Sequence, residues 1–464
     1  MAAGGDRDGY GRGAAVLSVG IGITGLVTYA YFALASHSLT EAEYGRITLL
    51  WSAVFVTVCI LYRPVEQLLS RTIADRAARG AAGDRHLRVA ATIQLALGLA
   101  FLAGALAFRD RIEDDLFGGS AELYWTLVVA VLAYAVSYFA RGFLAGSHRF
   151  GLYGGLVFME AVSRALFALA VAVGIASGQS VVALGIAAAP IVSLAVVPWA
   201  LRRHVARTAA GDLTPAEAAE ARLLDEAAGG EPGGEPEFTL AHGSGFAVAV
   251  LAIMAAEQTF LNAGPLIVNA TVEGAEGAIL AGFTFNVLLI ARAPLQLFQA
   301  VQTTILPHLT RLTALGAGDP FRRSVNATLL AIAAFAGCVA LAMLAIGPWL
   351  MDTVFGGDLA YHRLGLVLIS LGMGLYLASA TLNQALLARG LAPAAALCWL
   401  TSAAAFVGFL LFGGLDDRVL QVEIGYSAAA LLLCALLLGL YHRSHPPLAA
   451  PADTVAPQAM REAS

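Results

Sequence analysis

About twelve apolar runs make up most of this chain of 464 residues, and each is long enough, at about twenty residues, for a helix to cross the hydrocarbon core of a bilayer. Hydrophobic residues form 59% of the sequence and charged residues only 13%, so the apolar surplus is too large for one core and must face lipid. We therefore expect an all-α polytopic membrane protein and not a soluble enzyme. The runs cover residues 13–37, 47–69, 89–107, 123–140, 151–174, 181–201, 245–268, 278–300, 325–347, 364–386, 393–412 and 421–441.

A polar stretch between residues 202 and 243 divides the runs into two sets of six. Within it, residues 214–217 (Thr-Pro-Ala-Glu) have the form of a capping box with proline at the first helical position, which predicts a short surface helix. The expected units are an N-terminal six-helix lobe at 1–205, a linker at 206–243, a C-terminal six-helix lobe at 244–441 and a disordered tail at 442–464.

Arginine is distributed unevenly over the loops. Of the 27 basic residues, 19 lie on the alternate loops that include both termini and the linker, among them Arg141 after the fourth run. The opposite loops hold only Arg46, Arg109, Arg111, Arg363 and Arg418. Because loops rich in arginine are retained on the cytoplasmic side, we expect both termini, the linker and the tail to be cytoplasmic.

Short motifs occur in the same order in both halves, which indicates an internal repeat. The pattern Arg-x-x-x-Gln-Leu with a nearby proline begins at Arg63 and again at Arg292. A Phe-Gly-Gly turn begins at Phe117 and at Phe355, and a weaker match is a Leu-Ala pair after the fourth and tenth runs. Each half holds an even number of runs, so the two lobes are expected to be related by a pseudo-twofold axis along the membrane normal.

Polar side chains form stripes on two runs that match in this repeat. The first stripe consists of Arg63, Glu66 and Gln67, and the second of Arg292, Gln296, Gln299 and Thr303. A charge at the centre of a membrane costs at least about 2.5 to 3.5 kcal/mol, so such stripes normally face a cavity or a partner. The alternative for Arg63 is snorkelling, because it lies only about two turns from the end of its run. The matching position of Arg292 favours the cavity.

Two further groups of polar residues lie inside runs. Glu160 and Arg164 have the spacing and order of a helical ion pair, which we expect to be structural. Glu257, Gln258 and Asn262 lie near the middle of the seventh run, where a lone carboxylate is neutralised or paired. The expected partner of this carboxylate is the arginine of either stripe, and the alternative is that it binds a proton or a sodium ion during transport.

The sequence holds no catalytic or metal-binding motif. No Ser/His/Asp triad, Walker loop or metal-ligand cluster can be assembled from its loops, and each cysteine lies alone within an apolar run. The loops on the side opposite the linker have about fifteen residues or fewer, a length that seldom holds a catalytic domain. We therefore expect no enzymatic activity, no cofactor or metal, and no nucleic-acid partner.

The junction between the first two runs, residues 39–45, reads Leu-Thr-Glu-Ala-Glu-Tyr-Gly and resembles the Leu-Ser-x-x-Glu-Tyr/Phe-Gly junction of bacterial polysaccharide flippases, a family of the MOP exporter superfamily. The likeness continues from Arg63 to Gln67 and extends in outline over all the runs. It implies a flippase that moves an undecaprenyl-pyrophosphate-linked oligosaccharide across the bacterial plasma membrane by alternating access, among membrane lipids and in company with a polysaccharide polymerase and glycosyltransferases. The lipid II flippase branch fits less well, because its members have two more spans.

The resemblance and the polar residues together assign candidate roles. A diphosphate needs cationic donors, and a guanidinium offers paired N–H groups. The expected substrate-binding residues are Arg63, Gln67, Arg292, Gln296 and Gln299, and the expected ion-pair or coupling residues are Glu66, Glu160, Arg164, Glu257 and Asn262.

Two other functions remain as alternatives. A multidrug or metabolite cation antiporter of the same superfamily would need unpaired carboxylates, whereas the intramembrane charges here are three arginines and three glutamates, which suits an anionic head group better. A membrane glycosyltransferase or polymerase would need a large external loop that the chain lacks.

Overall fold

The computed structural model describes residues 5–78, 85–147, 149–209, 240–290, 292, 318–356 and 360–443. Within these ranges every regular element is helical, which confirms the all-α class. The helices are α1 (Gly5–Ser38), α2 (Glu41–Leu61), α3 (Arg63–Ala78), α4 (Arg85–Ala107), α5 (Arg109–Arg111), the π-helical turn η1 (Ile112–Leu116), α6 (Ala121–Gly146), α7 (Phe150–Ala172), α8 (Gln179–Ala209), α10 (Leu240–Thr271), α12 (Gly318–Phe355), α13 (Arg363–Ala388), α14 (Ala392–Phe412) and α15 (Arg418–Arg443). A further helix, Gly274–Ile290, follows α10 after a short turn.

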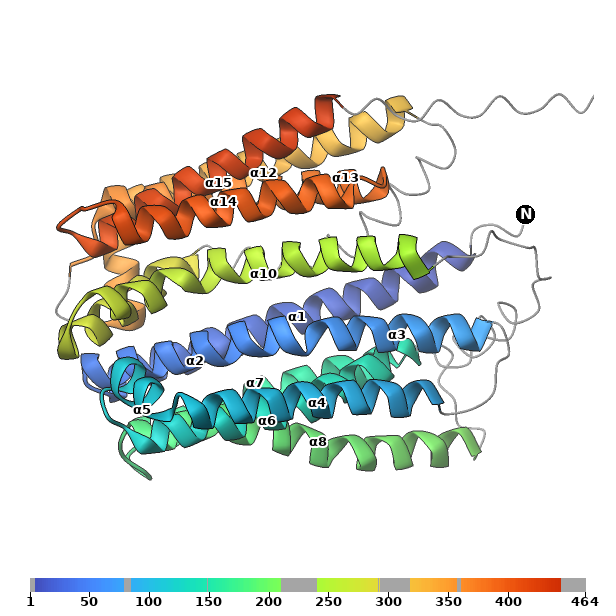
Figure 1. Ribbon diagram of the computed structural model, residues 1–464, viewed down its shortest axis with the longest axis horizontal. Coiled ribbons are helices and arrows are strands. Elements are labelled where there is room, and N and C mark those ends of the chain that lie inside the picture. The colour runs from blue at the N-terminus through green and yellow to red at the C-terminus, as the bar shows by residue number, and fades with distance from the viewer. Residues whose placement is uncertain are drawn as a thin grey trace, which may run out of the picture.

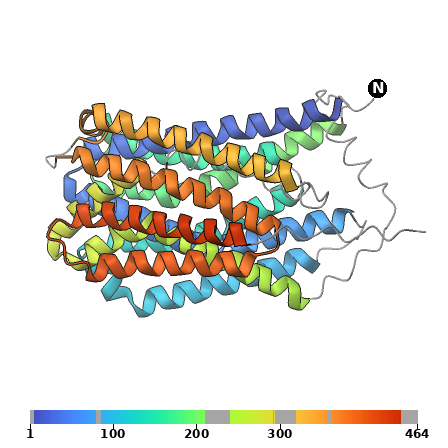
Figure 2. The same cartoon turned by 90° about the horizontal axis from the view of Figure 1, so that it is seen from above.

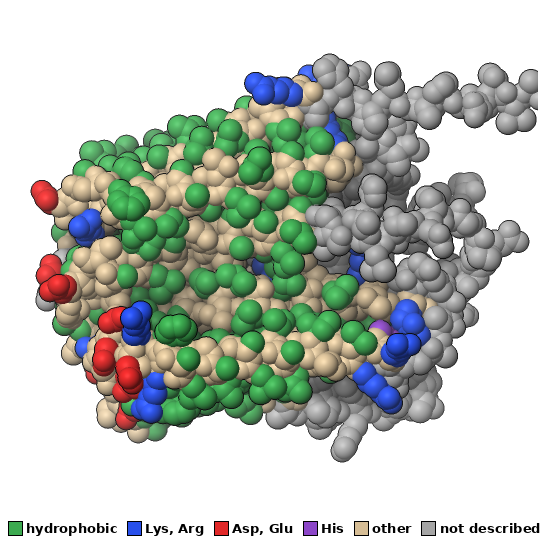
Figure 3. Space-filling view, viewed as in Figure 1, with side chains coloured by type: hydrophobic (Ala, Val, Ile, Leu, Met, Phe, Trp, Pro, Cys, Tyr) green, Lys and Arg blue, Asp and Glu red, His purple; other side chains and the backbone are tan. Residues whose placement is uncertain are grey.

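The outer surface of the bundle is built to face lipid. In the described ranges, nine helices are long and apolar enough to cross a membrane, with α2 and most of α3 counted as one span. Leu99 on α4 and both Leu330 and Leu341 on α12 are more than half exposed, as side chains in contact with lipid would be. Figure 3 shows apolar side chains along the length of the bundle, with acidic side chains at only one end of the face in view.

The helices run side by side along the long axis of the molecule (Figures 1 and 2). The start of α1, the end of α8, the start of α10 and the end of α15 all lie at one end, which we call the linker end. The turns after α1, α7, α10, α12 and α14 lie at the opposite end. The surface helix expected at 214–217 and the tail from residue 444 lie outside the described residues.

The helices form two sets that pack by the same plan. The pair α1 and α7 corresponds to α10 and α14, and the pair α6 and α8 corresponds to α13 and α15. The contacts of α4 with α6 and of α7 with α8 likewise recur between α12 and α13 and between α14 and α15. The repeated turns match as well, because Gly118 and Gly356 have similar positive φ angles of 59° and 62°. These correspondences confirm the two lobes: the N-lobe (α1 to α8) and the C-lobe (α10 to α15, with Gly274–Ile290).

The junction motif at residues 39–45 forms a helix start. The hydroxyl of Thr40 accepts a hydrogen bond from the backbone N–H of Glu43, and the carboxylate of Glu43 accepts one from the backbone N–H of Thr40 at 3.0 Å. This reciprocal capping box satisfies two backbone donors that the helix would leave open. The motif therefore fixes where α2 begins and, with it, the position of Tyr44 in the first turn.

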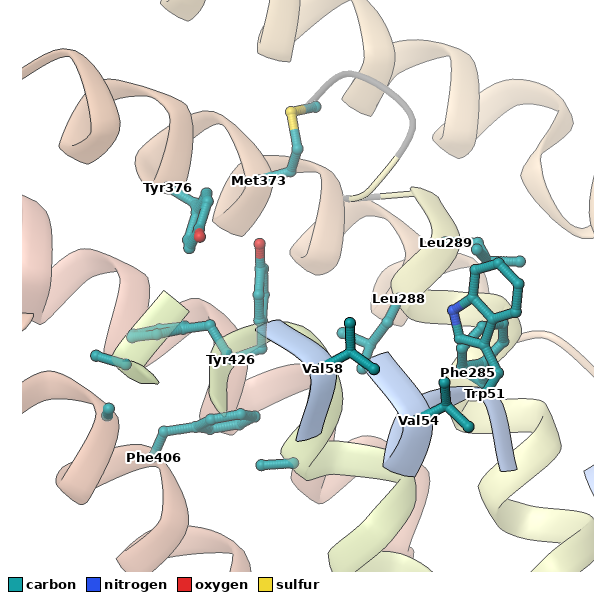
Figure 4. Close-up of a cluster of buried hydrophobic side chains, with 14 of the residues drawn as sticks. Trp51, Val54, Val58, Phe285, Leu288, Leu289, Met373, Tyr376, Phe406 and Tyr426 are labelled. Carbon is teal, nitrogen blue, oxygen red and sulfur yellow. The ribbon is translucent and has the colours of Figure 1, made fainter. Parts of the chain in front are cut away.

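The second span is broken between α2 and α3. Pro64 lacks a backbone N–H and fits only the first turn of a helix, so α3 starts at Arg63. On the α2 side of this break, apolar residues join both lobes in one core. Figure 4 shows Val58 of α2 close to Leu288 of the helix Gly274–Ile290. The break therefore places Arg63 where α2 leaves this shared core.

Candidate functional site

The two lobes touch at the opposite end through a chain of polar side chains. The hydroxyl of Tyr44 on α2 donates a hydrogen bond to Oδ1 of Asn286 at 2.5 Å. Nδ2 of Asn286 donates in turn to the hydroxyl of Tyr361 at 3.2 Å, just before α13 begins. All three residues are buried, so the bonds are formed out of contact with solvent. Asn286 thus connects the N-lobe to the start of α13.

Next to this chain the two backbones are in direct contact. A Cβ atom on Gly45 would lie 1.9 Å from the carbonyl oxygen of Ala278, and a Cβ on Gly282 would lie 3.0 Å from the Cα of Gly45. Only glycine permits an approach this close. The Tyr-Gly pair that ends the junction motif therefore supplies one hydrogen bond and one backbone contact, and both join the lobes at the opposite end.

Arg292 forms hydrogen bonds with α10. Its Nη2 donates to the carbonyl oxygen of Leu261 and, at 2.9 Å, to Oδ1 of Asn262. Leu261 is four residues before Pro265, which has no N–H to offer, so its carbonyl is open to another donor. The guanidinium also lies 4.4 Å from the centre of the Phe285 ring. The kink-prone proline thus creates an acceptor that orients Arg292.

Arg292 has no carboxylate partner among the described residues. No ion pair joins it to an acidic side chain there, and the groups that act on its charge are the hydroxyls of Tyr29 and Tyr426. Its Nε is buried without a hydrogen-bond partner in the described part of the chain. A guanidinium in this state retains unused donors and an uncompensated charge.

Arg63 lies within range of the charge of a carboxylate in the other lobe. Glu257 on α10 exerts the strongest attraction on its guanidinium, ahead of Glu66 on the next turn of α3. Of the two arginines expected as partners of Glu257, only Arg63 is acted on by its charge, and neither forms an ion pair with it within the described ranges. Glu66 accepts a hydrogen bond of 3.2 Å from the Tyr153 hydroxyl. The side chain of Gln67 is exposed, and Gln296, Gln299 and Thr303 lie outside the described residues.

The expected ion pair between Glu160 and Arg164 is not formed. Glu160 pairs instead with Arg141 of α6 and accepts a hydrogen bond of 2.6 Å from Ser137. Arg164 donates to the hydroxyl of Tyr134 at 2.8 Å and lies 5.0 Å from the centre of the Trp51 ring. Glu160 therefore faces α6, and Arg164 faces both α6 and α2, so their partners come from neighbouring helices and not from α7 itself.

Arg141 was expected in a loop, and this expectation is wrong. The helix α6 continues to Gly146, and Arg141 is only 9% exposed within it. The described intramembrane charges around α2 are therefore Arg63, Arg141, Arg164 and Arg292 against Glu66, Glu160 and Glu257. The site carries one more arginine than the sequence indicates, and an excess of positive charge favours an anionic ligand. The described residues contain no group of three or more His, Cys, Asp or Glu side chains placed to hold a metal ion.

Sequence comparison finds no match to a protein-family profile or to a curated protein. Comparison with solved structures finds proteins of similar fold. The inward-facing conformation of a multidrug resistance MATE family transporter of the MOP superfamily has a TM-score of 0.62 at 14% identity, covering 92% of this chain and 97% of that one. The outward-facing conformation of such a transporter has a TM-score of 0.57 at 15% identity, with 93% and 94% covered.

A second kind of transport protein has the same fold. The lipid II flippase MurJ, in an inward closed conformation, has a TM-score of 0.59 at 12% identity, covering 92% of this chain and 87% of that one. Identities this low show the fold alone. The chain therefore has the fold of these solved structures, two helical lobes that meet at a central interface.

Proposed function

We propose that this chain is a transporter that flips an undecaprenyl-pyrophosphate-linked oligosaccharide across the bacterial plasma membrane by alternating access. The observation that carries the proposal is Arg292, a partly buried arginine at the lobe interface whose Nε is buried without a partner and which has no carboxylate partner in the described part of the chain. An uncompensated buried cation is costly unless a ligand neutralises it. A diphosphate supplies both the charge and the paired oxygens that a guanidinium fits.

The two lobes would hold the head group from opposite sides. Arg63 comes from the N-lobe and Arg292 from the C-lobe, and each stands at the start of the same repeated motif. Without substrate, Glu257 attracts Arg63, so an arriving diphosphate would compete with this carboxylate. The sugars would enter the space between the lobes while the prenyl tail stays in lipid. Binding would then depend on both lobes.

The direction of transport follows from the distribution of arginine over the loops and from the contact between the lobes at the opposite end. The linker end is the cytoplasmic side, because most arginines of the loops belong to it, and both termini are cytoplasmic. The contact of Gly45 with Ala278 closes the other side, so the substrate enters from the cytoplasm, where glycosyltransferases complete it, and leaves toward a polymerase outside. Labelling of single-cysteine variants in intact cells tests this topology. Labelling of residues 210–239 from outside would reverse it.

Export of cationic drugs is the second candidate function. It is favoured by the likeness in structure to multidrug transporters and by the intramembrane carboxylate of Glu257. The two functions differ in which residues are essential. A cation exporter needs Glu257 and tolerates the loss of arginines, whereas the flippase needs Arg63 and Arg292.

The deciding experiment is flipping of a lipid-linked oligosaccharide in reconstituted vesicles. Arg63→Ala and Arg292→Ala should each abolish flipping, and Arg→Lys at either position should lower it strongly, because lysine keeps the charge but loses the paired donors. Arg88→Ala, on the exposed face of α4, is the matched control and should flip as the wild type does. Normal flipping by folded Arg63→Ala and Arg292→Ala would contradict the proposal. If Glu257→Gln loses export of a cationic drug while Arg63→Ala and Arg292→Ala keep it, the second function is favoured.

A further inference from the structure

Glu423 is a buried carboxylate in the C-lobe, away from the site described above. It lies in the second turn of α15 and is 3% exposed. Its carboxylate packs against α13 at Gly365, where a Cβ atom would lie 2.0 Å from Oε2 and 2.3 Å from Oε1. Any larger residue at position 365 would occupy the space of the carboxylate. The missing side chain at Gly365 therefore leaves the room that the Glu423 carboxylate occupies.

No described residue compensates the charge of Glu423. Neither a hydrogen bond nor an ion pair to its carboxylate is formed within the described ranges, whereas Arg418 and Gln421 on the same helix bond to each other at 2.9 Å. The charged group that acts on Glu423 is Asp417, at the start of α15, and it is also acidic.

The neighbouring helices supply no cation at this level. On α13 the two nearest titratable groups by sequence, His362 and Arg363, are exposed at the helix start. The half of α14 that lies at this end, residues 401–412, contains no titratable side chain, and neither does α10 from residue 258 to 271. A carboxylate in such surroundings is far more stable with a bound proton than as an anion.

We propose that Glu423 is a proton-binding site and that the proton it exchanges drives transport. The proposal rests on the function proposed above and names its coupling ion. In the arrangement described here the carboxyl group holds a proton. When the opposite end opens, water reaches the carboxyl, the proton leaves to it, and the carboxylate remains until the lobes close again.

The polar chain between the lobes lies close to the turn that covers Glu423. Tyr361, which accepts the hydrogen bond from Asn286, lies four residues before Gly365, one helical turn away. Opening of the lobes separates Tyr44 from Asn286 and so removes the N-lobe from the end of the molecule at which Tyr361 and the first turn of α13 lie. Water then reaches this end of α13, one helical turn from the residue that covers the Glu423 carboxyl.

The surroundings fit a proton better than a sodium ion. A metal cation needs several oxygen ligands around it. The nearby side-chain oxygens are engaged elsewhere: Oε1 of Gln421 accepts a hydrogen bond from Arg418 at 2.9 Å, and the hydroxyl of Ser427 donates to the carbonyl of Leu368 at 2.9 Å.

The first test measures protonation and does not depend on transport. Infrared difference spectra of the purified wild type during a pH titration should contain the band of a protonated carboxyl group that Glu423→Gln lacks. Glu273→Gln, an exposed glutamate at the same end of the molecule, is the matched control and should keep the band. A spectrum of Glu423→Gln identical to that of the wild type overturns the proton site. Gly365→Ala serves as a second variant, because its methyl group displaces the carboxyl and should shift the titration.

The second test measures coupling in vesicles that carry a pH gradient. A gradient should accelerate flipping of a lipid-linked oligosaccharide by the wild type and by Glu273→Gln, and should not change the rate of Glu423→Gln. Acceleration that persists in Glu423→Gln, or acceleration by a sodium gradient instead, overturns the coupling role. If the wild type flips no lipid-linked oligosaccharide under any condition, the proposed substrate is wrong, while the infrared titration still decides whether Glu423 binds a proton.

Discussion

The two lobes share a helix plan but differ in how they treat buried charge. In the N-lobe, Glu160 is matched by Arg141, and Arg164 is held by a tyrosine hydroxyl and aromatic rings. In the C-lobe, neither Arg292 nor Glu423 has a partner of opposite charge among the described residues. The backbone plan of a duplicated unit therefore does not determine its chemistry. Arg141, Glu160 and Arg164 thus serve the structure of the N-lobe itself, whereas Arg292 and Glu423 of the C-lobe stay available to ligands.

The largest predicted effect tests this difference directly. Arg141→Ala leaves Glu160 buried and unpaired, so it should lower the free energy of unfolding by about 3 to 5 kcal/mol. Arg292→Ala leaves no carboxylate unpaired and should change that free energy little, although it should abolish flipping. Thermal unfolding of the two variants in detergent, beside Arg88→Ala as the exposed control, measures the contrast.

The double variant Arg141→Ala/Glu160→Ala sharpens the result, because it removes both charges. It should recover part of the stability that Arg141→Ala loses. Equal destabilisation by Arg141→Ala and Arg292→Ala would show that the two lobes do not differ in the way described here.

Hydropathy and repetition were enough to predict the fold. The bilayer imposes one length on every span, so the apolar runs locate the helices without knowledge of their contacts. The repeated turn at Phe117 and Phe355 correctly indicated two lobes of one plan. Helix ends were less certain, because an apolar window stops at any charge and Arg141 stands just beyond one.

A signal for the longer helix was present in the sequence. Gly142 and Gly146 form a Gly-x-x-x-Gly pair, typical of close helix contacts in membranes. A Cβ on Gly142 would lie 2.8 Å from the carbonyl oxygen of Glu66, and one on Gly146 would lie 2.7 Å from that of Ser70. These glycines pack α6 against α3, and this contact keeps Arg141 inside the protein.

The partners of the buried charges could not be predicted in the same way. Spacing along one helix puts Glu160 and Arg164 on one face, but the rotation of that helix against α6 decides which cation meets Glu160. Glu423 lies near the end of its apolar run, where a charge is ordinary, and only the glycine across the interface shows that it is buried. Tertiary contacts of this kind leave no periodic signal in one sequence.

The second prediction compares the two glycines that meet between the lobes. Gly45→Ala would place Cβ 1.9 Å from a backbone oxygen, whereas Gly282→Ala would place it 3.0 Å from the Cα of Gly45. Gly45→Ala should therefore weaken closure of the opposite end by about 3 kcal/mol and Gly282→Ala by about 1 kcal/mol. Distances between spin labels on the two lobes, measured in nanodiscs, report the closed fraction. An unchanged distance distribution in Gly45→Ala would mean that this contact does not hold the lobes together.

The third prediction concerns the bridging amide between the lobes. Asn286→Leu leaves the buried hydroxyl of Tyr44 without its acceptor and should weaken the closed arrangement by about 2 kcal/mol. Thr284→Val on the same helix is the control, because the buried hydroxyl of Thr284 has no hydrogen-bond partner in the described part of the chain. The same spin-label distances apply. Similar shifts in both variants would mean that packing of this helix, and not the hydrogen bond, determines closure.

The smallest predicted effect asks how far the likeness between the lobes extends. Gly118 and Gly356 occupy the repeated turn with nearly the same φ, 59° and 62°, a conformation that costs a residue with a side chain about 1 kcal/mol or slightly more. Space does not distinguish them, because a Cβ would meet only Arg46 at 3.5 Å in the N-lobe and His37 at 3.6 Å in the C-lobe. Gly118→Ala and Gly356→Ala should therefore lower the thermal stability by the same small amount. A loss of stability in only one of the two variants would show that the lobe interface constrains the two turns differently, although their conformations are alike. The asymmetry of the lobes would then extend from their charges to their backbone.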